Sequence, residues 1–304
     1  VTFAQTAPNA QSNQISIQPY LDRVVENLTE YTLDNGMKFI VLRRPQAPVV
    51  SFLTYADVGG VDEPDGKTGI AHFLEHLAFK GTDRIGTKNY AKEKRLLERL
   101  DKLAEQVKQA QAAGEKDKVA RLQAEFKKVE EEAHNTVKQN ELGRIVEQEG
   151  GVGLNATTSA EATKYFYSFP ANKLELWMSL ESERFLNPEL RREFYKEKDV
   201  MLEERRMRVD NSPIGQMIEE FNDTAFEKLP YKRPVIGYEK DIRNLTTEDL
   251  QQFFETHYVP SNLTAAVVGD VQAAEVKKLA EAYFGRYEAR LKPEQKIPVE
   301  PKQT

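Results

Sequence analysis

Two histidines and a glutamate within a run of five residues are the side chains of this sequence best suited to carry out chemistry. His72, Glu75 and His76 lie in the stretch TGIAHFLEHLAFKGT, which covers residues 68–82. On a helix, positions 72 and 76 lie one turn apart on the same face, and the Glu75 carboxylate points into the same space. Two imidazoles at this spacing can bind one metal ion.

The residues around these three side chains predict a buried helix. Thr68 can cap its start, and most other positions are apolar: Ile70, Ala71, Phe73, Leu74, Leu77, Ala78 and Phe79. A helix that is apolar on nearly every side lies in the core, where unpaired polar groups are costly. A divalent cation would satisfy all three polar side chains. The alternative is that each histidine hydrogen-bonds a backbone carbonyl, as a single buried histidine usually does, but the triple favours a metal.

A second helix, predicted over residues 189–209, offers further acidic ligands. One of its stripes has steps of four, three, four and three and consists of Leu190, Phe194, Glu197, Met201 and Glu204. The apolar members place this stripe inward, so Glu197 and Glu204 are expected to point inward, whereas Glu203 is rotated by about 100°. Buried carboxylates need a cation, which a metal would provide. The alternative, stronger for Glu197 than for Glu204, is an ion pair with one of the nearby residues Arg205, Arg206 and Arg208.

The order H-x-x-E-H is the reverse of the common zinc-peptidase pattern H-E-x-x-H. With HFLEH followed by FKGT, the stretch resembles the core of the pitrilysin and mitochondrial-processing-peptidase family of zinc peptidases, in particular its smaller bacterial and organellar members. The resemblance runs from about residue 28 to about residue 288. It includes KEKDVMLEE, whose last residue, Glu204, matches the third zinc ligand of the family, while Glu197 matches a carboxylate that lies behind the metal.

The resemblance implies a zinc-dependent endopeptidase with one Zn2+ per chain, bound by His72, His76 and Glu204. Three protein ligands leave a fourth position for water, and zinc lowers the pKa of that water towards about 7. Glu75 is then the general base that activates the water and later the proton donor to the leaving amine. The implied substrates are extended peptides or unfolded protein segments.

Substrate binding is expected at an edge strand, to which an extended peptide can add as a further strand. The family pattern of Asn-Ala followed by Thr matches Asn155, Ala156 and Thr158; the alternative for Asn155 is an ordinary turn residue. The competing functional interpretation is a non-catalytic peptide-binding or partner subunit of a heteromeric peptidase complex. The complete set of metal-binding and catalytic residues argues against that interpretation.

Members of this family usually have two similar halves that close around the peptide like a shell. In this sequence the H-x-x-E-H motif occurs once, and so does the order of hairpin, strand and helix around it. We therefore expect a second homologous half, supplied in cis by a longer protein or in trans by another chain.

The remaining sequence predicts an α+β fold with a mostly antiparallel sheet packed against helices. Asn35-Gly36 between two β-rich runs predicts a hairpin of strands. Further strands are expected at 49–58, 152–158, 163–169 and 262–269, and further helices at 172–185 and 273–284. The expected domain division is a flexible tail at 1–27, a peptidase half-module at 28–288 and a linker at 289–304.

Residues 88–141 are rich in Ala, Glu, Lys, Leu, Arg and Gln, and two heptad-like runs joined at Gly114 predict an antiparallel helical hairpin. As an insertion, the hairpin would account for the 128 residues between His76 and Glu204 (204 − 76), a longer spacing than the family usually has. Replacing it with a short loop is therefore expected to leave the zinc site assembled. Its role is either decoration or the docking of a partner, and His134 within it is expected to be a solvated bystander.

Composition and charge exclude several other classes of function. A net charge of −6 and a pI near 5.5 give no electrostatic support for nucleic-acid binding. No apolar run approaches the roughly 18 residues of a membrane span. Without cysteine, a metal must bind His and carboxylate ligands. The absence of cysteine and the uncharged residues 1–21, which resemble the start of a mature exported protein, favour a periplasmic location in a bacterium. The alternative for residues 1–21 is a cytosolic disordered tail.

Overall fold

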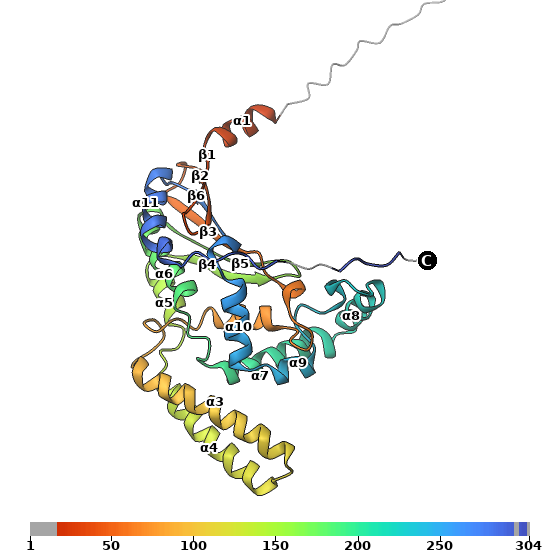
Figure 1. The fold of residues 1–304 in the computed structure, drawn as a ribbon. Coiled ribbons are helices and arrows are strands. Elements are labelled where there is room, and N and C mark those ends of the chain that lie inside the picture. Colours follow the sequence, from red (N-terminus) through yellow and green to blue (C-terminus); the bar gives the residue numbers. More distant parts are fainter. Residues whose placement is uncertain (1–16, 295–297, 303–304) are drawn as a thin grey trace, which may run out of the picture.

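The computed structural model describes residues 17–294 and 298–302, and its centre is a six-stranded sheet (Figure 1). The strands lie in the order β1-β2-β6-β3-β5-β4, and neighbouring strands are antiparallel except for the parallel pair β2 and β6. Their bounds are β1 (Leu28–Thr32), β2 (Lys38–Arg43), β3 (Val49–Ala56), β4 (Val152–Thr158), β5 (Thr163–Pro170) and β6 (Leu263–Gly269). The predicted α+β class and mostly antiparallel sheet are confirmed.

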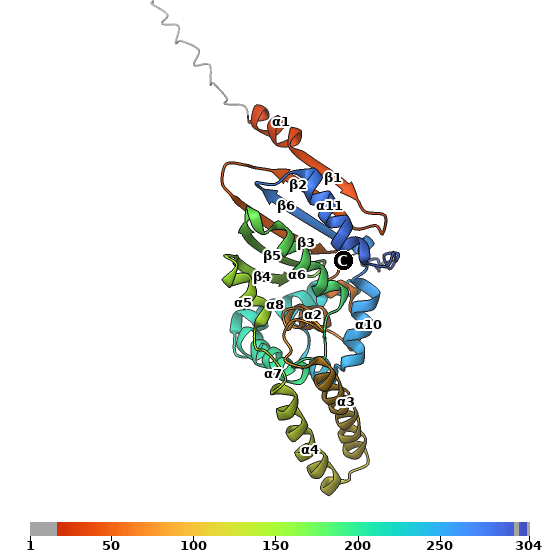
Figure 2. The same ribbon diagram turned by 90° about the vertical axis from the view of Figure 1, so that its left-hand side faces the viewer.

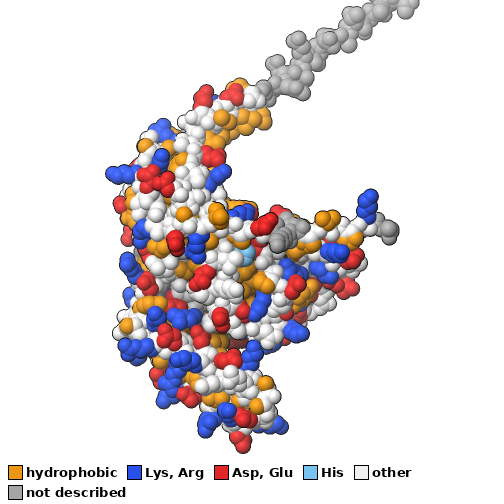
Figure 3. Space-filling model, in the orientation of Figure 1, with side chains coloured by type: hydrophobic (Ala, Val, Ile, Leu, Met, Phe, Trp, Pro, Cys, Tyr) orange, Lys and Arg blue, Asp and Glu red, His pale blue; other side chains and the backbone are white. Residues whose placement is uncertain are grey.

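One side of this sheet carries the main core. In β5 every second residue is buried and the residues between are half-buried, because successive side chains of a strand point to opposite sides. The buried side packs against α6 (Leu174–Leu186) and α11 (Ala273–Tyr283), where Trp177 stacks on Phe52 with ring centroids 4.3 Å apart (Figure 2). On the side away from α11, the surface has a broad hollow (Figure 3).

A group of helices below β4 and β5 completes the module (Figure 1). Helix α2 lies at its centre and contacts α7, α10 and β4. The remaining helices are α1 (Gln18–Glu26), α2 (Ile70–Leu77), α3 (Tyr90–Ala112), α4 (Lys116–His134), α5 (Glu141–Gln148), α7 (Phe194–Arg205), α8 (Pro213–Ala225), α9 (Glu239–Asn244) and α10 (Thr247–His257). Among the described residues, no helix combines the length and apolar character that crossing a membrane requires.

Helices α3 and α4 form the antiparallel hairpin that the heptad pattern predicts, and it projects away from the sheet (Figures 1 and 2). Near its start, Leu97 is buried and Leu96 is half-buried. The apolar seam between the two helices is formed by Leu97, Leu100, Leu103, Ala110, Leu122, Val129 and Ala133. That the hairpin is an insertion stays a prediction.

Within the expected tail at 1–27, residues 18–26 form α1. Pro19 suits the first turn of a helix, and the apolar residues that follow recur at helical spacing. Residues 1–16 lie outside the described residues. The described parts of the predicted linker form neither helix nor strand. The division into tail, module and linker stays a prediction.

Candidate metal centre

The start of α2 is built by residues that the sequence did not reveal. Gly69 precedes the helix with φ +87°, and the buried Glu63 carboxylate accepts hydrogen bonds from the backbone N–H groups of Gly69 and Ala71, each at 3.0 Å. These bonds satisfy donors that a helix start leaves unpaired. The predicted capping role of Thr68 is wrong, because its hydroxyl donates to Asp241 at 2.7 Å instead. Glu63 was missed because nothing in its local sequence distinguishes it from the other acidic loop residues.

Helix α2 is buried on most sides, as its composition predicts. Its buried residues are Ile70, Ala71, Phe73, Leu74 and Leu77. The helix ends at Leu77, and the chain then turns at Gly81 with φ +95°. His72 and His76 therefore lie on the one face of the helix that is not covered by apolar side chains.

Three nitrogen and oxygen atoms converge on this face. His72 Nε2 lies 3.3 Å from His76 Nε2 and 3.8 Å from Glu204 Oε2, while His76 Nε2 lies 3.4 Å from the same Glu204 oxygen. A tetrahedral zinc ion with bonds of about 2.0–2.1 Å keeps neighbouring ligand atoms about 3.3–3.4 Å apart. The donor set therefore fits zinc in both chemistry and spacing. Among the described residues, this is the one group of three such side chains compact enough to hold a metal.

The electrostatics of the two histidines differ. Burial lowers the pKa of His72 to about 4, with His76 adding to the effect. Burial also lowers the pKa of His76, but hydrogen bonds to Glu197 and Glu204 outweigh it and raise the pKa to about 9. His72 is thus neutral at pH 7, the form in which a histidine can bind a metal, whereas His76 would have to release a proton to do so.

Helix α7 carries Glu204 and places Glu197 behind His76. Glu197 Oε2 lies 3.3 Å from His76 Nδ1, and Glu197 Oε1 accepts a hydrogen bond of 2.5 Å from Lys80. Glu197 therefore pairs with a lysine and not with one of the three arginines, whereas Glu204 does pair with Arg208, at 3.0 Å, through the carboxylate oxygen that is not on the histidines. Glu203 is exposed and pairs with Arg206 at 2.5 Å, as its different direction on the helix predicts.

The bounds of α7 depart from the prediction. The helix begins at Phe194 rather than at 189, because Glu193 adopts a left-handed conformation with φ +57°. It continues beyond Arg205 as a π-helical turn, Arg206–Asp210. Single π-helical turns are frequent at functional sites, and this one follows the position of Glu204 directly.

Glu75 lies beside the three converging atoms and contacts the sheet. Its Oε2 accepts a hydrogen bond of 2.5 Å from the hydroxyl of Thr158 in β4. Burial raises the pKa of Glu75, while the hydrogen bond from Thr158 acts in the opposite direction. The contact between Glu75 and Thr158 joins residues 83 positions apart in the chain, and the sequence did not predict it.

The strand that supplies Thr158 is at the edge of the sheet. β4 pairs with β5 on one side, and none of the described strands pairs with its other side. Ala156 is buried, and Asn155 is exposed with its side-chain oxygen accepting from the Ala156 N–H at 2.9 Å. The three predicted substrate-binding residues therefore lie on one free strand edge next to Glu75, and their binding role stays a prediction. A pocket of about 400 Å³ adjoins Glu75 and His76.

Family models match most of this chain. The model described as "Insulinase (Peptidase family M16)" matches residues 38–120 and 132–239, and "Peptidase M16 inactive domain" matches residues 244–304. The chain belongs to the insulinase family of peptidases, M16, which confirms the resemblance seen in the motif. The matched residues include all of α3, and the match to this model is interrupted only at residues 121–131. It therefore does not show that the whole hairpin is an insertion.

Relatives agree with this family. The chain is 32% identical to "Zinc protease PqqE" of Helicobacter pylori over 83% of its own length and 46% of the relative, and 27% identical to a probable mitochondrial-processing peptidase subunit beta of Schizosaccharomyces pombe over 84% and 45%. The chain spans about half the length of these curated relatives.

Solved structures share the fold. A crystal structure of a protease from Helicobacter pylori is similar with a TM-score of 0.70 and 30% identity, over 91% of this chain and 55% of that one. The periplasmic protease PqqL of Escherichia coli is similar with a TM-score of 0.65 over 91% of this chain and 26% of that one; at 21% identity this likeness shows the fold alone.

Proposed function

We propose that this chain is the zinc-binding half of a metalloendopeptidase that cleaves extended peptides or unfolded protein segments. The observation that carries the proposal is the convergence of three donor atoms, with the carboxylate of Glu75 beside them and outside the group. His72, His76 and Glu204 would hold one zinc ion per chain, and Glu75 lies next to them without joining the cluster. The names of the relatives, zinc protease and processing peptidase, support the same chemistry.

Each residue then has a defined task. A bound zinc ion supplies a Lewis acid that acidifies water and polarises a peptide carbonyl. Glu75 accepts the proton of the attacking water and donates it to the leaving amine. The raised pKa of Glu75 suits this task, because a carboxylate that gains and returns a proton works best when its pKa approaches the working pH. Thr158 holds the carboxylate oriented through its hydroxyl.

The substrate is proposed to bind as an additional strand along β4. The free edge of this strand offers unpaired backbone N–H and C=O groups, which bind any extended peptide with little dependence on its sequence. Asn155, Ala156 and Thr158 lie along this edge and lead to Glu75. A folded segment cannot pair in this way, so unfolded substrates are favoured.

A second homologous half is part of the proposal, in cis or in trans. The relatives are about twice as long as this chain, and the hollow beside the sheet is open on its right in Figure 3. Closing that hollow would exclude water and orient the scissile bond. A periplasmic location is also proposed, supported by the absence of cysteine.

The test measures zinc content and hydrolysis of a mixture of unfolded fluorogenic peptides, with and without the C-terminal half of a close relative. We expect one zinc per chain, weak hydrolysis by the chain alone and an increase by orders of magnitude with the second half. Glu75→Gln should keep zinc and lower the rate by about 10²–10⁴-fold, the usual contribution of a general base.

Three results would contradict this proposal. Absence of zinc from the wild-type chain would remove the metal centre. Hydrolysis at the parent rate by Glu75→Gln would exclude Glu75 as the base. Full activity of the monomeric chain alone would show that no second half is needed.

A further inference from the structure

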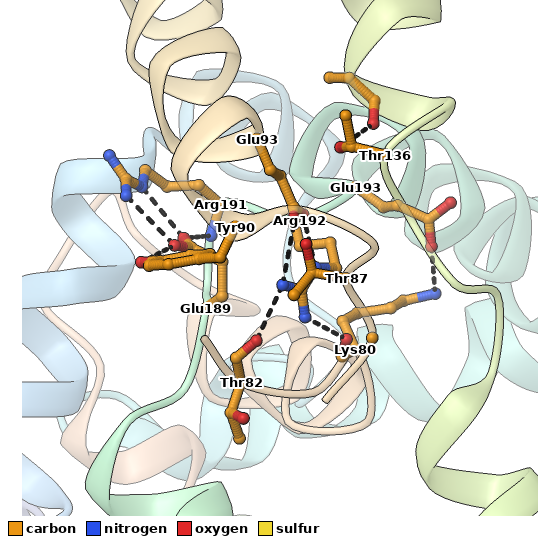
Figure 4. A network of polar contacts seen from close by, with 12 residues as sticks. Lys80, Thr82, Thr87, Tyr90, Glu93, Thr136, Glu189, Arg191, Arg192 and Glu193 are labelled. Carbon is orange, nitrogen blue, oxygen red and sulfur yellow. Dashed lines mark hydrogen bonds and ion pairs between the residues drawn. The ribbon is translucent and has the colours of Figure 1, made fainter. Parts of the chain in front are cut away.

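A buried polar network joins α2 to the root of the hairpin (Figure 4). Its centre is Arg192, whose side chain is completely buried. The guanidinium pairs with Glu93 of α3 at 2.6 Å and 3.1 Å, and it donates to the backbone carbonyls of Lys80, Thr82 and Ile85 at 2.9, 2.8 and 2.8 Å. All five N–H donors of the guanidinium are thereby used.

The turn after α2 wraps closely around this guanidinium. Gly81 and Gly86 both have positive φ, at +95° and +90°. A Cβ at Gly86 would lie 2.7 Å from Arg192 Nη1, and a Cβ at Gly81 would lie 2.3 Å from the Ile85 carbonyl oxygen. The backbone of Lys80, at the start of this turn, is held by the hydrogen bond from Arg192 to its carbonyl, in a turn that has no room for side chains at Gly81 and Gly86.

The side chain of Lys80 points from this fixed position towards the metal centre. Its ammonium lies 2.5 Å from Glu197 Oε1 and 3.5 Å from a carboxylate oxygen of Glu193. The other oxygen of Glu197 lies 3.3 Å from His76 Nδ1. A continuous path of contacts thus runs from Arg192 through Lys80 and Glu197 to the ring nitrogen of His76 that faces away from the converging donor atoms.

We propose that Lys80 is a positioning residue for His76, acting through Glu197. The proposal rests on the metal site proposed above. Glu197 is buried, with 7% of its surface exposed, and a buried carboxylate is costly unless it is paired. Lys80 supplies the paired charge and holds one oxygen of Glu197, so that the other oxygen remains on His76 Nδ1. The histidine ring then keeps Nε2 directed at the metal.

The magnitude expected follows from the general behaviour of metal sites. A histidine ligand usually donates its second ring N–H to a carboxylate or carbonyl, and loss of that partner weakens metal binding by about 10–100-fold. Removal of Lys80 leaves Glu197 in place but frees it to turn away from His76, so the loss of zinc affinity should fall within this range.

The experiment measures zinc affinity by competition with a chromogenic chelator. Lys80→Met, which keeps most of the apolar stem, should lower zinc affinity by about 10–100-fold. Lys80→Arg should restore most of it, since a guanidinium can also pair with Glu197. Lys67→Met is the matched control: Lys67 pairs with Asp249 at 2.5 Å just before the same helix but has no contact with a carboxylate that reaches a histidine.

The outcomes separate this inference from the proposed function. Wild-type chain that binds no zinc would overturn the metal site, and the inference with it. Wild-type affinity in Lys80→Met, or equal losses in Lys80→Met and Lys67→Met, would overturn the role of Lys80 while the metal site stands. An equal loss in Lys80→Met and Lys80→Arg would also overturn it, because the positive charge would then be irrelevant.

Discussion

Two pairs of helices, α3 with α4 and α2 with α7, differ in the side chains that lie between them. Helices α3 and α4 pack through an apolar seam, and their polar side chains are mostly exposed. Helices α2 and α7 also share an apolar contact, with Phe73 stacked on Phe194 at 4.9 Å, but three buried or half-buried polar side chains lie beside it: His76, Glu197 and Glu204. The hairpin is stabilised by its own residues, whereas the metal-site pair depends on neighbours that neutralise and orient its polar groups.

The two pairs of helices contact each other at the root of the hairpin, the part nearest the sheet, which includes Glu93, Asp101 and Phe126. Tyr195 of α7 packs against Phe126 of α4 with ring centroids 4.8 Å apart and donates to Asp101 of α3 at 3.1 Å. Arg192 pairs with Glu93, and both side chains are completely buried. The root therefore belongs structurally to the metal-site region, and only the distal hairpin is independent of it.

The largest effect is expected from deleting the whole hairpin, and this deletion tests whether its root supports the proposed metal site. The sequence led us to expect that residues 88–141 could be replaced by a short loop without harm, and the structure changes this expectation. Full replacement removes Glu93 and leaves Arg192 buried without its carboxylate, which costs about 3–5 kcal/mol. We expect the full deletion to unfold or to bind no zinc, as measured by circular dichroism and zinc content.

The matched control is a shorter deletion. Replacing residues 104–124 with a short Gly-rich turn keeps Glu93, Tyr195 and their contacts, and it removes only the distal part of the seam. This variant should fold and bind zinc with wild-type affinity. Equal stability of the two deletions would show that the root does not support the metal site.

The second prediction compares adjacent residues on α7. Glu204→Gln removes the charge of the proposed third ligand. Loss of a residue that only hydrogen-bonds a ligand weakens metal binding by about 10–100-fold, so loss of the ligand's own charge should lower zinc affinity by more than about 100-fold. Glu203→Gln should have no effect on zinc, because Glu203 is exposed and directed at Arg206. Zinc titration of both variants decides this, and equal losses would contradict the assignment of Glu204.

The grouping of side chains at the proposed metal site could be predicted better than the order of the strands. The spacing of His72 and His76 and the stripe through Glu204 contain directional information, because helical periodicity determines which side chains share a face. The same logic separated Glu203 from Glu204. The strand order could not be obtained in this way, since pairing of β2 with β6 joins segments that are more than 200 residues apart, for example Lys38 and Thr264.

The contacts that were missed are of two kinds. Glu63 accepts from the N–H groups of Gly69 and Ala71, six and eight residues further on, and does not stand out among the acidic residues of its loop. Arg192 donates to the Lys80 carbonyl, and Thr158, which was expected to bind substrate, donates to Glu75; in both cases only the fold brings the partners together. The late start of α7 was missed for a different reason. Glu193 takes a left-handed conformation that glycine or asparagine usually signals, and its contacts with Lys80 and Gln139 hold it there instead.

The smallest effect is expected from Thr158, where the polar character of the metal-site pair extends to the sheet. Its hydroxyl donates a 2.5 Å hydrogen bond to Glu75. Thr158→Val keeps the shape of the side chain and removes this bond, and a hydrogen bond to a charged group is worth about 1.5–3 kcal/mol. We expect the peptidase rate to fall by about tenfold, the lower end of that range, because water can replace the hydroxyl at a partly open site.

Two controls and a second measurement make this prediction specific. Thr157→Val alters the neighbouring residue, which is exposed and points to the opposite side of β4, so the rate should not change. Thr158→Ser keeps the hydroxyl and should restore most of the activity. Zinc affinity should be the same in all three variants, because the hydroxyl of Thr158 donates to Glu75, the proposed base, and not to a proposed zinc ligand. If Thr158→Val and Thr157→Val lose activity equally, the edge strand acts through substrate binding alone, and the hydroxyl of Thr158 does not orient Glu75.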